Sequence, residues 1–187
     1  MSVMDFKKVG TPISAQICKD LKAGDWILLS GWVYSARDQA HIRLKELIEA
    51  GSEIPFSLEG EVIYYMGPSP APPGEIIGSA GPTTSSRMDS YAPLLYSLGL
   101  KATLGKGERS EKVKDALVKY GGIYLATVGG AGAYLAERIK KVELVCWQDL
   151  GPEAVQRLYV EDFPCVVAYD SSGRDFFKEQ RERYKKE

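Results

Sequence analysis

The sequence predicts an α/β fold: one domain over residues 1–187 whose mixed sheet is covered by helices. In the second half, short apolar runs alternate with amphipathic segments, and strand–helix–strand units of this length indicate a partly parallel sheet. Extended runs in the first half add further strands. The chain has 187 residues, of which 44% are hydrophobic and 26% are charged, so it can form one well-packed core.

The first half is expected to contain two helices and three extended runs. Asp38 is a good N-cap for the second helix, and Gly51 ends it. Gly31 separates two of the extended runs, and the proline-rich segment 67–74 forms a loop. In chain order the elements are a helix over 14–21, extended runs over 26–30 and 32–35, a helix over 38–50 and a strand over 62–66.

The second half alternates helices with strands. Ser110 caps one helix, Gly121 and Gly122 stop it, and the following run is apolar throughout, as in a strand buried on both faces. Pro93 either lies in the first turn of the preceding helix or kinks it. The expected elements are a helix over 88–98, a strand over 100–104, a helix over 110–120, a strand over 123–128, a helix carrying Leu135 and Ile139, strands over 142–147, 157–160 and 165–169, and a polar C-terminal helix.

The densest polar cluster is the run Thr83, Thr84, Ser85, Ser86 and Arg87 at the expected start of a helix. Free N–H groups and the positive end of the helix dipole favour a carboxylate or phosphate there. The arginine adds a planar donor fork that suits a carboxylate. The alternative is that one hydroxyl simply caps the helix, but a cap needs one such residue rather than four with an arginine.

A second cluster, residues 37–43, also lies at a helix start and contains His41, the one histidine of the chain. The helix dipole disfavours a protonated imidazole in the first turn, which suits a neutral hydrogen-bonding or proton-transfer group. A satisfied, partly buried histidine is the alternative. Arg37 precedes this helix and either points at a ligand or is solvated.

Two glycine-rich turns complete the candidate features. Lys106 lies between Gly105 and Gly107, where the backbone can approach a ligand closely, although an ordinary turn has the same composition. The run 129–133 follows a strand, but Leu135 breaks the dinucleotide-binding register, so tight packing or backbone approach is favoured. These are anion-binding clusters without an obvious catalytic group, as in a half-site that holds substrate.

The net charge and the cysteines indicate which partners and which cellular location to expect. The formal net charge is -1, which gives no electrostatic reason to expect nucleic acid, and no helix has the basic face that lies on membranes. Cys18, Cys146 and Cys165 are widely spaced and form no metal-ligand pattern, so we assign no metal ligand and expect a reducing, cytoplasmic location. No targeting segment is expected, because no apolar run follows the first eight residues.

Nearly the whole chain resembles the β subunit, or C-terminal region, of class I fumarases and tartrate dehydratases. The most specific stretches are GPTT at 81–84, RMDSY at 87–91 and LGKGERS at 104–110. The other matching stretches are ARD at 36–38 through His41, IYY at 63–65, VGG at 128–130, DLG at 149–151 and VEDFP at 160–164. Ser85 and Ser86 replace the Ala-Gly or Ser-Gly pair common in fumarases.

The resemblance implies a swivelling β/β/α domain that closes over a cluster-bearing α subunit. In the family, three cysteines of the α part hold a 4Fe–4S cluster, whose open iron acts as a Lewis acid on the substrate hydroxyl and carboxylate. The cysteines of this chain do not match those ligands. The resemblance therefore implies a heterodimer or heterotetramer in which the partner, not this chain, holds the cluster.

The resemblance also implies roles for six residues. Thr83 matches the threonine proposed as catalytic base, and an unassisted hydroxyl is a poor base, so this role depends on its surroundings. His41 matches a histidine treated as part of the active site, which either meets substrate or supports Arg37. The residues expected to bind the dicarboxylate are Arg37, Thr83, Thr84, Arg87 and Lys106.

The expected function is that of the β subunit of an iron–sulfur fumarate hydratase, which interconverts fumarate and malate. The alternatives are a tartrate dehydratase or mesaconate hydratase β subunit, or a non-catalytic ligand-binding or regulatory module that kept the fold. Residues 87–91 and 106–110 look closer to fumarases than to tartrate dehydratases.

Overall fold

A computed structural model of the chain describes residues 5–185. The predictions of one domain over 1–187 and of no targeting segment in the first eight residues extend to residues 1–4 and 186–187, which lie outside the described residues. The architecture confirms the expected α/β class, with a mixed sheet of seven strands and helices packed on it.

The sheet has the strand order β1-β2-β3-β4-β5-β7-β6. The first five strands in this order run parallel, whereas β7 is antiparallel to β5, β6 and β2. The strands are β1 (Phe6–Gly10), β2 (Trp26–Ser35), β3 (Val62–Tyr64), β4 (Ala102–Gly105), β5 (Ile123–Ala126), β6 (Ile139–Cys146) and β7 (Val155–Tyr169).

The sheet folds back on itself because β7 pairs with two of the parallel strands. One edge of β7 pairs with β2 from Val166 to Gln156, and Val166 also lies in register with Ala126 of β5. The pairs β2–β3, β3–β4, β4–β5, β5–β7 and β7–β2 therefore close a ring. This gives two β layers, which suits the β/β/α arrangement expected for the family.

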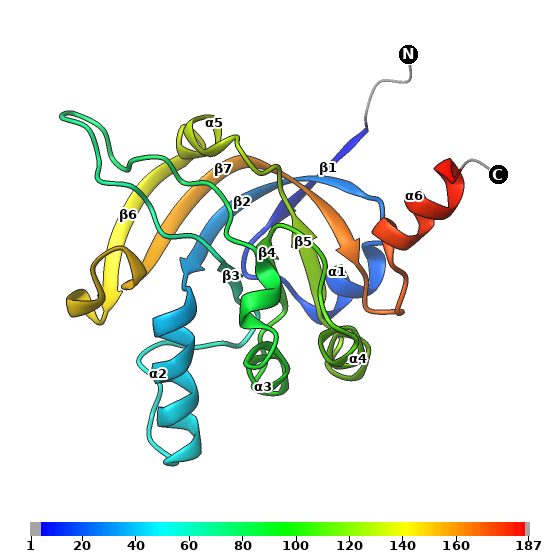
Figure 1. Ribbon diagram of the computed structural model, residues 1–187, viewed down its shortest axis with the longest axis horizontal. Coiled ribbons are helices and arrows are strands. Elements are labelled where there is room, and N and C mark those ends of the chain that lie inside the picture. Colours follow the sequence, from blue (N-terminus) through cyan, green and yellow to red (C-terminus); the bar gives the residue numbers. More distant parts are fainter. Residues whose placement is uncertain (1–4, 186–187) are drawn as a thin grey trace.

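Three helices cover one outer face of this ring. Figure 1 shows α2, α3 and α4 side by side on that face, with α6 at the end that carries the C-terminus and α5 on the opposite side. The helices are α1 (Ala15–Asp20), α2 (Asp38–Glu49), α3 (Ala92–Ser97), α4 (Glu111–Tyr120), α5 (Gly132–Ala136) and α6 (Phe176–Tyr184), with short 3₁₀ turns η1 (Ser85–Met88) and η2 (Gln148–Glu153).

Two apolar cores follow from alternation along the strands. Ile27 and Leu29 of β2 point into the ring, together with Leu125 of β5. The neighbouring Tyr124 of β5 points the other way and packs in the helix-side core with Leu44 of α2. Successive strand side chains face opposite sides, so strands buried on both faces contribute to both cores.

Several elements differ from the predictions. Phe6–Gly10 forms a strand that the sequence analysis missed, and Ile139 begins β6 instead of ending a helix. The two predicted runs around Gly31 are one strand with a bulge, and the two runs before Tyr169 are one strand of 15 residues. Arg37 is the N-cap of α2, not Asp38.

The predicted helix over 88–98 is divided. Ser85–Met88 forms a 3₁₀ turn, and the α-helix begins at Ala92 with Pro93 in its first turn. Proline is tolerated there because its missing N–H has no partner in that turn. The hydroxyl cluster therefore enters a 3₁₀ turn and does not precede an α-helix, which weakens the argument from the helix dipole.

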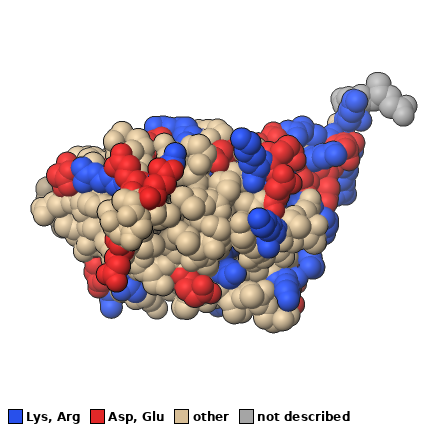
Figure 2. Space-filling model, turned by 90° about the horizontal axis from the view of Figure 1, so that it is seen from below, with Lys and Arg blue, Asp and Glu red and all other residues tan. Residues whose placement is uncertain are grey.

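Charges of both signs lie on the face seen in Figure 2. Uncharged residues occupy much of its middle, and Lys, Arg, Asp and Glu are interspersed toward the end that carries α6. This face shows no uniform basic patch of the kind that attracts a phosphate backbone. Over residues 5–185, no helix has the length and apolar character that crossing a membrane requires.

Candidate active site

The candidate site lies where parallel strands end. Arg37 follows β2, Lys106 follows β4 directly, and Thr83 returns to the same edge by donating its backbone N–H to the carbonyl of Tyr65 at 2.7 Å, just beyond β3. The carboxyl ends of adjacent parallel strands share one edge, where α/β sheets commonly bind ligands. Segments distant in sequence thus converge on one place.

The predicted threonine and lysine segments are directly paired. Thr84 and Lys106 form a parallel β-bridge. Ser85 donates its N–H to the Lys106 carbonyl at 2.9 Å, and Lys106 donates to the Thr83 carbonyl at 3.3 Å. The backbones of the two predicted carboxylate-binding segments are therefore fixed against each other, with Thr84 exposed and Thr83 partly exposed.

Glycines leave room for the side chains around the Thr84–Lys106 bridge. A Cβ at Gly129 would lie 3.2 Å from Cδ and 3.6 Å from Nζ of Lys106, so the lysine lies along that backbone. A Cβ at Gly105 would meet Ser85 Oγ at a distance that no real contact allows. The glycine-rich turns thus accommodate side chains of this site, which agrees with the preference for close packing over a dinucleotide loop.

The Asp38 carboxylate approaches both arginines that are predicted to bind substrate, Arg37 and Arg87. Its Oδ1 and Oδ2 accept hydrogen bonds from Nε and Nη2 of Arg87 at 2.9 and 2.8 Å. Its Oδ2 is also 3.7 Å from Nε of Arg37. The fork of Arg87 is held on one side, and Nη1 lies outside this contact on a half-exposed side chain. The sequence analysis treated Asp38 as a helix cap and missed this contact.

Arg37 is held by packing more than by hydrogen bonds. A Cβ at Gly67 would lie 2.7 Å from Nη1 and 2.9 Å from Cδ of Arg37, so the side chain crosses this glycine. Its Nη2 is 3.6 Å from Oε1 of Glu153, which is an ion pair longer than a hydrogen bond. Nε is buried without a hydrogen-bond partner among the described residues.

His41 is fully buried beneath Arg37. Its Nδ1 lies 2.7 Å from the Arg37 carbonyl, which can only accept, so Nδ1 carries the proton of the neutral ring. The ring packs against Tyr65 and Tyr91. Burial lowers the pKa of His41 to about 4, against the hydrogen bond to Arg37 that raises it. These contacts position Arg37, whereas a role in proton transfer stays a prediction.

Behind the site lies a buried network that the sequence analysis did not identify. Arg109 is sandwiched between the rings of Tyr65 and Tyr124, at 5.2 and 5.0 Å from their centroids. Its Nε donates to Oδ1 of Asp89 at 2.6 Å, and Oδ2 of Asp89 accepts from the Ser110 N–H. The sequence offered a signal for this network in the stretches RMD and GERS, which contain Asp89 and Arg109. A buried arginine requires a carboxylate partner, so the two could have been expected to pair.

The capping alternative for the hydroxyl cluster finds no support at η1. Thr84 is its N-cap residue and makes no side-chain cap hydrogen bond. Ser85 is buried and holds the neighbouring turn, while Ser86 and Arg87 are exposed. The hydroxyls of this run are therefore distributed over packing and surface positions.

Comparison with known proteins decides the family. The family model described as "Fumarase C-terminus" matches residues 4–180, which is nearly the whole chain. The chain belongs to this family. The resemblance inferred from the GPTT, RMDSY and LGKGERS stretches is thereby confirmed, and relatives bearing the names fumarate hydratase and tartrate dehydratase place the family among hydro-lyases.

The chain is similar to relatives named as fumarate hydratases and to one named as a tartrate dehydratase subunit. It is 48% identical over 153 residues to "Fumarate hydratase class I, anaerobic" of Escherichia coli, and 46% identical over 153 residues to "Fumarate hydratase 1, mitochondrial" of Leishmania major. Each match covers 81% of this chain and 28% of the relative, so the chain spans about a quarter of these proteins. It is also 38% identical to "Putative L(+)-tartrate dehydratase subunit beta" of Methanocaldococcus jannaschii, with 86% of both chains covered.

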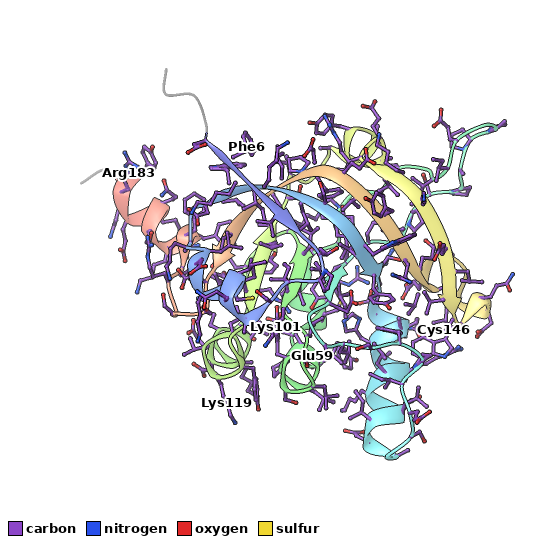
Figure 3. The ribbon with its side chains drawn as sticks, turned by 180° about the vertical axis from the view of Figure 1, so that it is seen from behind. Phe6, Glu59, Lys101, Lys119, Cys146 and Arg183 are labelled. Atoms are coloured by element: carbon purple, nitrogen blue, oxygen red, sulfur yellow. The ribbon has the colours of Figure 1, made fainter. Side chains whose placement is uncertain are left out.

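The cysteines do not fit the iron–sulfur cluster that the family implies. Cys18 and Cys165 are buried within the ring, and burial raises the pKa of the Cys18 thiol to about 11 and that of Cys165 further. Cys146 lies apart, at the end of β6 beside α2 (Figure 3). Between residues 5 and 185, no group of three or more His, Cys, Asp or Glu side chains could hold a metal ion. A cluster needs accessible thiolates that converge.

Proposed function

We propose that this chain is the β-type region of a class I, iron–sulfur fumarate hydratase. The observation that carries the proposal is the convergence of Arg37, Arg87 and the Thr83–Lys106 pair at one strand edge, in a family whose relatives are named fumarate hydratases. The residues so gathered suit a dicarboxylate with one carboxylate at each end.

The two arginines and the lysine of the candidate site suit carboxylates in different ways. Arg37 and Arg87 offer planar guanidinium forks that match carboxylate geometry, and both approach the same Asp38 carboxylate. Lys106 supplies a compact charge from the end of β4, which is separated from β2 by β3. We propose that the arginines orient one carboxylate while Lys106 and the exposed Thr84 bind the other.

Thr83 is the proposed proton-transfer group. Its backbone is fixed by hydrogen bonds to Tyr65 and Lys106, so its side chain projects from a rigid segment. A threonine hydroxyl needs a stronger base beside it to accept a proton, and we propose that a carboxylate of the partner supplies it. His41 remains a second predicted member of this chemistry, acting through Arg37 or after a rearrangement that exposes its ring.

The cluster belongs to a partner in this proposal. The cysteines described above do not form a ligand set, and the fumarate hydratases matched here are several times longer than this chain. The relative with the printed name "subunit beta" supports a two-subunit assembly, as a heterodimer or heterotetramer with an α subunit.

Tartrate is the second candidate substrate, because the relative of the same length carries a tartrate dehydratase name. Six relatives named fumarate hydratase are 44–48% identical to this chain, against 38% for that protein and 35% for the "Putative fumarate hydratase class I" of Geobacillus stearothermophilus, and this balance favours fumarate hydration. Turnover of the reconstituted complex on malate, on both tartrate enantiomers and on mesaconate decides between them. Faster dehydration of either tartrate than of malate would reject the fumarase assignment.

The catalytic proposal is tested by Thr83→Val in the complex with a cluster-loaded partner. We expect kcat to fall roughly a hundredfold or more with little change in KM, the usual scale for lost acid–base catalysis. Thr127→Val is the matched control, because Thr127 directly follows β5, its hydroxyl donates to the Pro164 carbonyl at 2.9 Å, and the substitution keeps its backbone bond to Gly105. Equal, near-normal turnover in both variants would leave this chain as a carboxylate clamp or a non-catalytic binding module.

A further inference from the structure

Tyr124 of β5 lies behind the candidate site with its hydroxyl between two site segments. The side chain is fully buried, and its phenol oxygen is 2.8 Å from the Gly107 carbonyl and 3.0 Å from Ser85 Oγ. A carbonyl can only accept and a phenol has one proton, so Tyr124 donates to Gly107 and the Ser85 hydroxyl donates to Tyr124. Neither Ser85 nor Gly107 belongs to β5, so the two hydrogen bonds connect Tyr124 to two other segments of the chain.

Both partners are next to the residues proposed to bind substrate. Ser85 follows Thr83 and Thr84, and Gly107 follows Lys106. The backbone bond from Ser85 to the Lys106 carbonyl at 2.9 Å already joins the same two segments. Tyr124 therefore adds a second, side-chain connection between them from a buried position.

The ring that carries this hydroxyl is itself immobilised. The guanidinium of Arg109 lies 5.0 Å from its centroid, and Tyr169 packs at 5.4 Å on a tilted plane. Arg109 is in turn fixed by Asp89 at 2.6 Å and by Thr103 Oγ1 at 2.8 Å. Since the phenol cannot shift without breaking this packing, its oxygen defines a fixed point between the two segments.

We infer that Tyr124 is a positioning residue, whose hydroxyl holds the Thr83–Ser85 segment and the Lys106–Gly107 turn at the one spacing that a dicarboxylate needs. The inference rests on the proposed function for its catalytic consequence, but the clamp itself is a property of this chain alone. Small errors in the spacing of substrate-holding groups carry large rate penalties.

Tyr124→Phe tests the clamp, because it keeps the ring against Arg109 and removes only the hydroxyl. Tyr96→Phe is the matched control: Tyr96 is also fully buried, and its hydroxyl makes two hydrogen bonds, to Thr103 Oγ1 at 2.8 Å and to the Ile123 carbonyl at 2.9 Å. Neither bond reaches Ser85 or Gly107, and Thr103 Oγ1 keeps the hydrogen bond that it accepts from Arg109, so the control matches the general cost of losing a buried hydroxyl.

The first readout is amide hydrogen exchange of the full chain without any partner. In Tyr124→Phe we expect the amides of Ser85 and Lys106 to exchange about tenfold faster than in Tyr96→Phe, because a local tether is lost. Equal exchange at these amides in the two variants overturns the clamp. Ser85→Ala removes the other end of the same tether, so adding it to Tyr124→Phe should change these rates little further.

The second readout is steady-state kinetics in the complex with a cluster-loaded partner. We expect Tyr124→Phe to lower kcat/KM about tenfold and Tyr96→Phe to leave it near the wild-type value. Faster exchange with unchanged kcat/KM would overturn the positioning role while keeping the tether. A wild-type complex that turns over no dicarboxylate would instead reject the proposed function, and the exchange result would still decide the clamp.

Discussion

At the scale of single residues, the Asp38 carboxylate holds Arg87 in one orientation at the candidate site. Its pair with Asp38 lies on a half-exposed surface, where an ion pair contributes at most about 1 kcal/mol to stability. The consequence of the pair is orientation: Nε and Nη2 are occupied, and the remaining edge of the fork faces away from Asp38. The carboxylate that holds Arg87 also approaches Arg37, so one residue aligns both predicted substrate-binding arginines.

We expect Arg87→Lys to raise KM about tenfold or more with a smaller change in kcat. Lysine keeps the charge but loses the planar fork that binds a carboxylate with two parallel bonds. Arg43→Lys is the control, because Arg43 of α2 forms the same kind of two-bond pair with Asp149 of η2 on the surface. Kinetics of the reconstituted complex compare the two, and equal KM values would show that Arg87 does not bind substrate.

Gly67→Ala is expected to displace Arg37. The added Cβ would lie 2.7 Å from Nη1 and 2.9 Å from Cδ, and the carbonyl of Pro152 at 3.0 Å leaves little room on the other side. We expect KM for the dicarboxylate to rise about tenfold, because one carboxylate loses its oriented donor. Gly10→Ala is the control, since its nearest neighbour would be 4.0 Å away. A normal KM in Gly67→Ala would show that Arg37 is not a binding group.

His41 makes stability depend on pH in a defined window. The pKa of His41 is about 4 in the folded chain and near its ordinary value of 6.5 in the unfolded chain, so between these pH values the unfolded chain binds more protons. Stability is therefore full above pH 6.5 and falls as the pH drops toward 4, by up to about 3 kcal/mol. His41→Asn keeps a donor for the Arg37 carbonyl but cannot titrate.

Urea unfolding at pH 4.5 and pH 7 measures this effect. We expect the wild-type chain to lose about 2–3 kcal/mol more than His41→Asn between the two pH values. Other titrating groups are common to both proteins and cancel in the difference. Equal losses would show that His41 is not buried in its neutral form.

At the scale of the elements, irregularities in β2 and β7 lie opposite each other. Gly31 has a φ of +118° at the bulge in β2, and Asp162 of β7 has a φ of +47°. The Asp162 N–H donates to Ser30 Oγ at 2.9 Å, which joins the two irregular positions. Bulges increase local twist and bend a strand, which lets β7 pair with β2 along its length and also reach β5.

Gly31→Ala is expected to destabilise the chain by about 2–4 kcal/mol. A side chain is strained at this φ, and the added Cβ would meet Thr11 Oγ1 within 2.3 Å and the Thr11 backbone at about 3.1 Å. Asp162→Gly, which relieves a positive φ in the partner strand, should change stability by less than about 1 kcal/mol. Urea denaturation of both variants checks this, and a stable Gly31→Ala would contradict the role of the bulge.

At the scale of the whole molecule, the predicted site residues and the cysteine thiols lie in different places. The arginines, Thr84 and the lysine turn lie at an edge of the sheet with exposed or partly exposed side chains, while the thiols are directed into the ring or lie apart from one another. The division proposed above, with carboxylate binding here and the cluster on a partner, follows this distribution.

Purified alone under anaerobic conditions, the chain is therefore expected to be folded, colourless and without hydratase activity. Iron content, visible absorption and circular dichroism measure these three properties, and co-expression with the cluster-bearing partner should restore activity. An isolated chain that binds a brown, iron-containing cluster would overturn the proposed division of labour, because its thiols would have to rearrange to converge.

Local pattern determined most of the elements. Apolar periodicity, the caps Ser14 and Ser110 and the stop at Gly121 predicted helices that the structure contains, because such signals act within a few residues. The motif stretches determined the family and the predicted site residues. A continuous apolar run also predicted a strand over 123–128, of which Ile123–Ala126 is strand.

Tertiary structure alone decided the rest, because strand pairing joins residues far apart in sequence. Phe6–Gly10 is a strand only beside β2, and the continuity of β7 depends on pairing with β2, β5 and β6. Asp38 meets Arg87 across 49 positions, and Tyr124 meets Ser85 across 39. No periodicity encodes such contacts, so the sequence by itself predicted which residues serve the site, and the closed sheet decided how these residues face one another.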